Sequence, residues 1–116
     1  MTKSETIRIC SILDIPDDEP LAVELKNGNK LAVYRIDDEY FVTSNVCTHG
    51  NALLSEGWQE GDVIECPFHG GAFFIKTGEP AEYPCVKAIK SYAVTIEDDS
   101  IFISLSEAEN AEPDSF

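Results

Sequence analysis

Two short segments in the middle of the chain carry both of its histidines and two of its four cysteines. The first segment holds Cys47 and His49, the second holds Cys66 and His69, and residues 50–65 separate them. Two ligands at such short spacing let the side chains of one loop converge on a metal. A glycine follows each histidine, which allows the backbone to turn tightly beside the site. The sequence therefore predicts one metal centre built by two loops.

The distribution of the ligands narrows the choice of metal. In zinc fingers the two cysteines usually share one loop and the two histidines share another. Here each loop carries one cysteine and one histidine. This arrangement suits a two-iron centre in which one iron takes both thiolates and the other takes both imidazoles. A zinc-stabilised interaction module remains the alternative from a different functional class.

Alternation of apolar and polar residues predicts an all-β fold. A sustained helical repeat of apolar residues is not found, and an Asn27-Gly28 pair is typical of a hairpin turn. We expect an antiparallel barrel or sandwich base, whose first strands form a meander, and a smaller cluster-binding subdomain at about 44–84. Residues 1–105 are expected to form one domain, and the acidic tail 106–116 to be disordered. The predicted strands are 7–13, 21–26, 31–36, 40–43, 92–96 and 101–105.

The charge of the chain limits its partners. It has 22 acidic and 8 basic residues and a formal net charge of −14. Such a surface repels nucleic acids and anionic membranes and favours a partner with a basic docking surface. The sequence also lacks an apolar run of membrane-spanning length and the apolar centre of a signal peptide. We therefore expect a cytoplasmic protein with reduced cysteines.

The two ligand pairs, together with Phe73, the Thr77-Gly78 turn and Pro84, resemble the signature of Rieske proteins. More narrowly, the chain resembles the small Rieske-type ferredoxins of bacterial aromatic-ring-hydroxylating dioxygenase systems. The resemblance implies the Rieske fold and one [2Fe–2S] cluster. It implies that a third loop around Pro84 covers the cluster. It assigns the thiolates to one iron and the imidazoles to the other, with the ligands Cys47, Cys66, His49 and His69.

The same resemblance implies a one-electron carrier rather than an enzyme. Such a carrier passes electrons from an NAD(P)H-dependent flavin reductase to the terminal oxygenase. No further histidines remain for a mononuclear iron site, and no Gly-x-Gly-x-x-Gly motif is present for a flavin or nicotinamide. A Rieske-like small subunit of an assimilatory nitrite reductase is the alternative carrier. Cys10 and Cys85 are interpreted as small buried residues, or as a disulfide pair, and Phe74 has no assigned role.

Departures from the respiratory Rieske pattern predict a low reduction potential. Ala52 and Phe68 stand where those proteins have a disulfide, and Gly71 and Phe73 stand where they have hydroxyl groups near the cluster sulfurs. Fewer hydrogen bonds to sulfur leave the more negative reduced state less stabilised. We expect a potential of about −150 mV, at the bottom of the Rieske range. Voltammetry of the purified protein measures it, and a value above about +100 mV would contradict this prediction.

Overall fold

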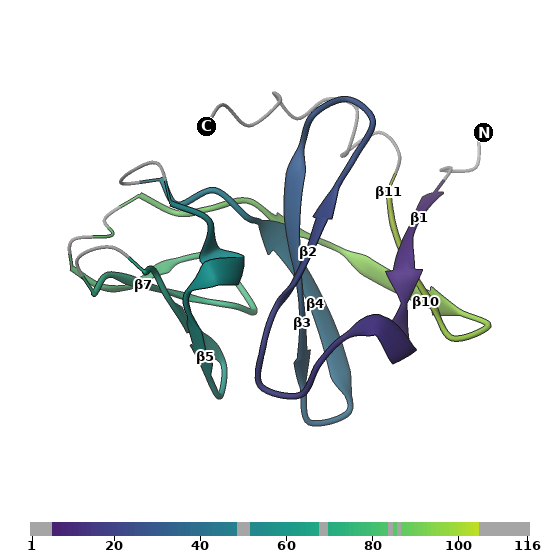
Figure 1. Cartoon of the computed structure of the whole chain (residues 1–116), viewed down its shortest axis with the longest axis horizontal. Helices are drawn as coiled ribbons and strands as arrows, with labels where there is room; N and C mark the ends of the chain where they lie inside the picture. The colour runs from purple at the N-terminus through teal and green to yellow at the C-terminus, as the bar shows by residue number, and fades with distance from the viewer. Residues whose placement is uncertain (1–5, 49–51, 68–69, 84, 86, 105–116) are drawn as a thin grey trace.

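The computed structural model describes residues 6–48, 52–67, 70–83, 85 and 87–104. These residues form three antiparallel sheets, so the all-β prediction is confirmed. Figure 1 shows the three sheets side by side along the long axis of the molecule. Among the described residues, no helix is long and apolar enough to cross a membrane.

The first sheet joins the two ends of the described chain. It contains β1 (Thr6–Ser11), β10 (Val94–Glu97) and β11 (Ser100–Ser104), in the order β1-β11-β10. The prediction that the first strand belongs to a meander is therefore wrong, because β1 pairs with β11. This pairing lets Ile9 pack in one buried cluster with Ile101 and Ile103.

The first strand is also shorter than predicted, because it ends at Ser11. The Ser11 hydroxyl accepts a hydrogen bond from the Leu13 N–H at 3.1 Å, and the Asp14 carboxylate accepts one from the Ser11 N–H at 3.2 Å. These two bonds form a capping box. They start a short 3-10 helix at Ile12–Asp14 in place of the last strand residues.

The second sheet lies between two hydrophobic cores. It contains β2 (Leu21–Glu24), β3 (Lys30–Ile36), β4 (Glu39–Ser44) and β9 (Ser91–Tyr92), in that order. The predicted meander is confirmed for β2, β3 and β4. Successive side chains of a strand point to opposite faces of its sheet. Leu31 and Val33 of β3 accordingly pack in one core, and Ala32 and Tyr34 pack in the other.

The third sheet covers the second of these cores. It contains β5 (Trp58–Glu60), β6 (Val63–Glu65), β7 (Ala72–Phe74) and β8 (Pro80–Glu82), in that order. A second 3-10 helix, Leu54–Glu56, precedes β5. Ile64 and Phe73 point inward from β6 and β7 and are fully buried. This core also contains three of the four cysteines, which are Cys47, Cys66 and Cys85.

Gly57 allows the chain to pass very close to the end of β6. A Cβ atom added at Gly57 would lie 1.9 Å from the backbone oxygen of Glu65, the residue before Cys66. That separation is shorter than any real contact of a Cβ atom. Glycine is therefore required here by the approach of two backbones, and any side chain would displace the segment that leads into Cys66.

We predict that Gly57→Ala lowers the free energy of unfolding by about 1–3 kcal/mol, because the added methyl group forces backbone shifts in a packed region. Urea denaturation followed by circular dichroism measures the change. Gly61→Asn is the matched control, because Gly61 has φ 61° and no atom within 4 Å of the added Cβ, and asparagine tolerates that conformation. Equal stability of Gly57→Ala and the parent protein would contradict the prediction.

Candidate metal centre

The first predicted loop begins where β4 ends. Cys47 is 2% exposed, and its backbone N–H donates to the carbonyl oxygen of Ala52 at 2.9 Å. An antiparallel bridge between Val46 and Leu53 lies directly beneath this bond. The two contacts bring the ends of the loop together, so the Cys47 side chain starts from a fixed position in the core.

The second predicted loop has the same construction. Cys66 follows β6 directly and is fully buried. Its backbone N–H donates to the carbonyl oxygen of Gly71 at 2.7 Å. In each loop, the cysteine N–H thus bonds to the residue five positions later. Each cysteine therefore stands at the start of a loop that the same hydrogen bond closes.

Asn45 holds the base of the first loop and was not recognised from the sequence. Its backbone N–H donates to the carbonyl oxygen of Lys30 at 2.8 Å, and its own carbonyl accepts from the Leu54 N–H at 2.7 Å. Its side-chain amide donates to the Ser55 hydroxyl at 2.9 Å and accepts from the Ser55 N–H at 2.7 Å. Nothing in the local sequence distinguishes this buried asparagine from an ordinary turn residue.

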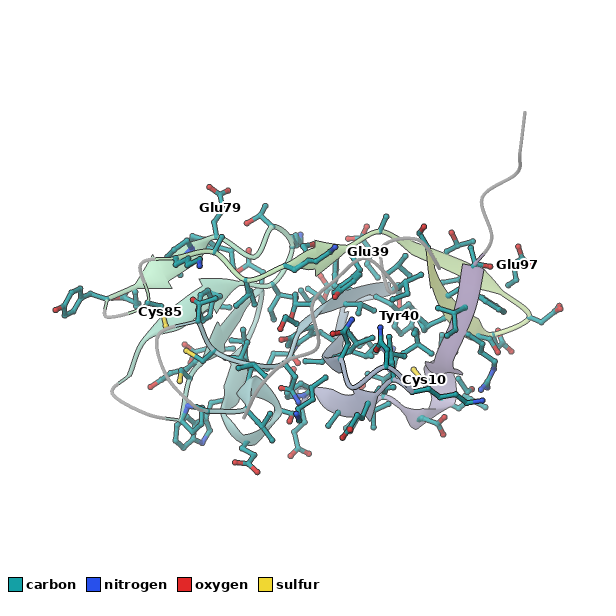
Figure 2. The ribbon with its side chains drawn as sticks, turned by 90° about the horizontal axis from the view of Figure 1, so that it is seen from above. Cys10, Glu39, Tyr40, Glu79, Cys85 and Glu97 are labelled. Carbon is teal, nitrogen blue, oxygen red and sulfur yellow. The ribbon has the colours of Figure 1, made fainter. Side chains whose placement is uncertain are left out.

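The third cysteine of this core, Cys85, lies against the first loop. Its Sγ is 3.7 Å from the Sγ of Cys47, and both side chains are 2% exposed. Burial raises the pKa of the Cys85 thiol to about 12, and the neighbouring Cys47 and Cys66 contribute to the rise. Figure 2 shows Cys85 at the end of the molecule opposite Glu97. The alternative of a Cys10–Cys85 disulfide is wrong, because both are free and lie in different cores.

The structure therefore brings together two of the four predicted ligands, Cys47 and Cys66, in one buried core. The other two, His49 and His69, lie outside the described residues, as does Pro84 of the predicted third loop. Within the described part of the chain, no three His, Cys, Asp or Glu side chains are arranged to hold a metal ion.

The described donors fit an iron–sulfur cluster. Thiolates are the protein ligands of such clusters. The Cys47 and Cys66 side chains share an apolar core with Leu54, Ile64 and Phe73, so the site is shielded from water. Each of the two loops begins with a buried thiol. Together they supply the two cysteine ligands that the sequence predicts.

An acidic groove lies next to the second loop. It has a volume of about 510 Å³ and reaches Gly70 at the end of that loop. Trp58 and Phe74 contribute exposed rings, with 60% and 41% of their surfaces accessible. The carboxylates that line the groove belong to Glu60, Glu65 and Glu82. The groove therefore offers both apolar surface and negative charge.

Comparison with known proteins shows the same fold with high similarity. A solved ferredoxin of Sphingomonas yanoikuyae B1 is 50% identical, with a TM-score of 0.84 over 86% of this chain and 98% of that one. The ferredoxin component of the p-cumate 2,3-dioxygenase system of Pseudomonas putida is 37% identical over 103 residues, which cover 88% of this chain and 87% of the relative.

A third similar protein was solved in a complex of reduced oxygenase and oxidised ferredoxin in carbazole 1,9a-dioxygenase. The matching chain is 38% identical, with a TM-score of 0.80 over 88% of this chain and 94% of that one. Residues 5–93 also match the Rieske [2Fe–2S] domain family. That match covers most of the sequence and includes both loops and all four cysteines. The chain therefore belongs to the Rieske [2Fe–2S] domain family.

Proposed function

We propose that this protein is a one-electron carrier that serves an aromatic-ring dioxygenase system. The observation that carries the proposal is the pair of identically closed loops, each of which begins with a buried cysteine. A Rieske [2Fe–2S] cluster, when bound, accepts and releases one electron at a time. The chain supplies the ligands, excludes water from the thiolates and presents a surface to its partners.

The proposed ligand set consists of the two cysteines, which the structure describes, and the two histidines, which lie outside the described residues. Cys47 and Cys66 provide the thiolates, and their burial in an apolar core supports this role. His49 and His69 provide the imidazoles on the strength of the family match and their spacing from the two cysteines. Histidine in place of two thiolates makes the cluster less negative, which raises its reduction potential.

The proposed partners are a ferredoxin reductase and a terminal oxygenase. The similar proteins are ferredoxins, and one of them was solved in a complex of oxygenase and ferredoxin. This similarity favours an electron-transfer component over an enzyme and over a nitrite reductase small subunit. The zinc module is wrong, because the family is a [2Fe–2S] family. Rapid oxidation of the reduced protein by a ring-hydroxylating oxygenase, but not by a nitrite reductase, would distinguish the two carrier roles.

The remaining sequence predictions are part of this proposal. We propose one domain at 1–105, with a cluster-binding subdomain at about 44–84 that contains all of the third sheet. We also propose a cytoplasmic location. The two ligand cysteines must stay reduced, and the cytoplasm keeps cysteines reduced. The tail 106–116 lies outside the described residues.

We predict that Cys47→Ala and Cys66→Ala each abolish cluster binding, because each removes a thiolate ligand. His69→Ala should lose the cluster or change its spectrum. Iron and labile-sulfide analysis measures occupancy, and low-temperature electron paramagnetic resonance of the dithionite-reduced protein measures the ligand type. Cys10→Ala is the control, since Cys10 is also buried but lies in the other core.

Two outcomes would contradict the ligand proposal. One is a fully loaded cluster with unchanged resonance in Cys66→Ala. The other is a parent protein whose reduced cluster lacks the low mean g-value of a cluster with imidazole ligands. The first outcome would show that Cys66 is not a ligand. The second outcome would show that the cluster is not of the Rieske type.

We predict that neutralising the groove slows association with the oxygenase. The triple variant Glu60→Gln/Glu65→Gln/Glu82→Gln should lower the association rate by about tenfold at low ionic strength, because electrostatic steering by a basic partner is lost. The effect should shrink as salt is added. Stopped-flow oxidation of the reduced protein measures it, after absorption spectra show that the cluster is intact.

The control changes the same number of charges at the far end of the molecule. Glu97→Gln/Asp98→Asn/Asp99→Asn alters the last residue of β10 and the turn that follows it, at the end opposite Cys85 (Figure 2). An equal loss of rate in both triple variants would show that total charge matters and that the groove does not dock the oxygenase.

A further inference from the structure

Cys85 makes a contact that the ligand set does not explain. It lies outside both Cys/His pairs, yet its Sγ approaches within 3.7 Å of the Sγ of Cys47. This distance lies within the range of a hydrogen bond between sulfurs. Both sulfurs are shielded from solvent, since each side chain is 2% exposed. The contact therefore lies away from bulk solvent.

Three backbone-anchored bonds hold this segment in place beside the first loop. The Cys85 N–H donates to the carbonyl oxygen of Glu82 at 3.1 Å. The Thr48 hydroxyl, next to Cys47, donates to the carbonyl oxygen of Lys87. The Ile89 N–H donates to the carbonyl oxygen of Gly78 at 2.9 Å.

Gly78 adds a steric constraint to the same segment. A Cβ added at Gly78 would lie 2.2 Å from the oxygen of Ile89, so only glycine permits this approach. Its φ of 80° also favours glycine. The segment that carries Cys85 is thus held at two places, the hairpin between β7 and β8 and the first loop. These two attachments determine the position of the Cys85 sulfur.

We propose that the thiol of Cys85 donates a hydrogen bond to the Sγ of Cys47 and thereby raises the reduction potential of the cluster. The inference rests on the proposed role of Cys47 as a ligand. A ligand thiolate has no proton and can only accept, so the proton of this contact belongs to Cys85. Cys85 is a positioning residue, because it acts through the sulfur of Cys47.

The direction of the effect follows from electrostatics. A hydrogen bond to a charged acceptor is stronger than one to a neutral acceptor. The added electron makes the ligand sulfur more negative, so the bond stabilises the reduced state more than the oxidised state. Gly71 and Phe73 provide no hydroxyl group for this purpose. The Cys85 thiol is a weak hydrogen-bond donor. It supplies one of the hydrogen bonds to sulfur that Gly71 and Phe73 do not provide.

A purely structural role for Cys85 makes a different prediction. Buried cysteine also packs as a small apolar residue, and Cys85 belongs to the same core as Ile75 and Ile89. Packing alone would affect the free energy of unfolding and the yield of loaded protein. It would leave the reduction potential of the loaded protein unchanged when the replacement fills the same space without a donor.

The test compares reduction potentials of loaded variants by voltammetry. Cys85→Val removes the donor and keeps a similar volume, and we expect its potential to be more negative than that of the parent. Cys85→Ser keeps a donor, and we expect its potential to be equal to or more positive than that of the parent. Cys10→Val is the matched control in the other core, and its potential should be unchanged.

A second measurement reads the hydrogen bond in the parent protein and uses two variants only to assign the band. Reduced-minus-oxidised infrared spectra of the parent protein should show an S–H stretching band that moves to lower frequency on reduction. The band should be absent in Cys85→Ser and present in Cys10→Val. With Cys47 and Cys66 bound to iron, Cys10 and Cys85 are the two remaining thiols.

The outcomes separate this inference from the proposed function. A parent protein without Rieske spectral features would overturn the function itself. A normal Rieske spectrum would overturn only the hydrogen bond if Cys85→Val left the potential unchanged, or if the S–H band stayed fixed on reduction.

Discussion

The burial of two cysteine sulfurs in one apolar core is the constraint on which the rest of the structure depends. Each sulfur enters the core at the start of a loop that a cysteine N–H closes onto a carbonyl five residues later. The first loop follows β4 and is held at its base by the hydrogen bonds of Asn45. The second loop follows β6, whose end packs closely against Gly57. The third sheet and β3 then cover the core from both sides, as Figure 1 shows for the sheets.

The two hydrophobic cores contain different cysteines. The core between the first and second sheets contains Cys10 and no proposed ligand, whereas the other contains Cys47, Cys66 and Cys85. Strand β3 contributes side chains to both cores, so the two cores pack on opposite faces of the same strand. Outside this apolar interior, the surface is strongly acidic, with a formal net charge of −14 for the chain. An electron site shielded from water thus lies beneath a surface that attracts basic partners.

Local patterns predicted the features that depend on neighbouring residues. Alternation at 21–36 and the Asn27-Gly28 pair predicted β2, β3 and their hairpin, because the period of a strand and the geometry of a turn are local properties. The pairing of β1 was predicted wrongly, since alternation gives the faces of a strand but not its neighbour. Its partner β11 lies at the other end of the described chain. The capping box at Ser11 shortened β1 through two side-chain bonds that alternation does not reveal.

The sequence by itself supplied the candidate ligands, and its resemblance to Rieske proteins supplied the kind of centre. Cys47, His49, Cys66 and His69 are proposed from their spacing, because side chains a few residues apart on one loop can converge on one metal site. Only the tertiary structure decided that Asn45 supports the first loop and that Cys85 contacts Cys47. Those two cysteines are 38 positions apart. Their contact depends on how β7, β8 and the following segment pack against the first loop, and a linear pattern contains no measure of that distance.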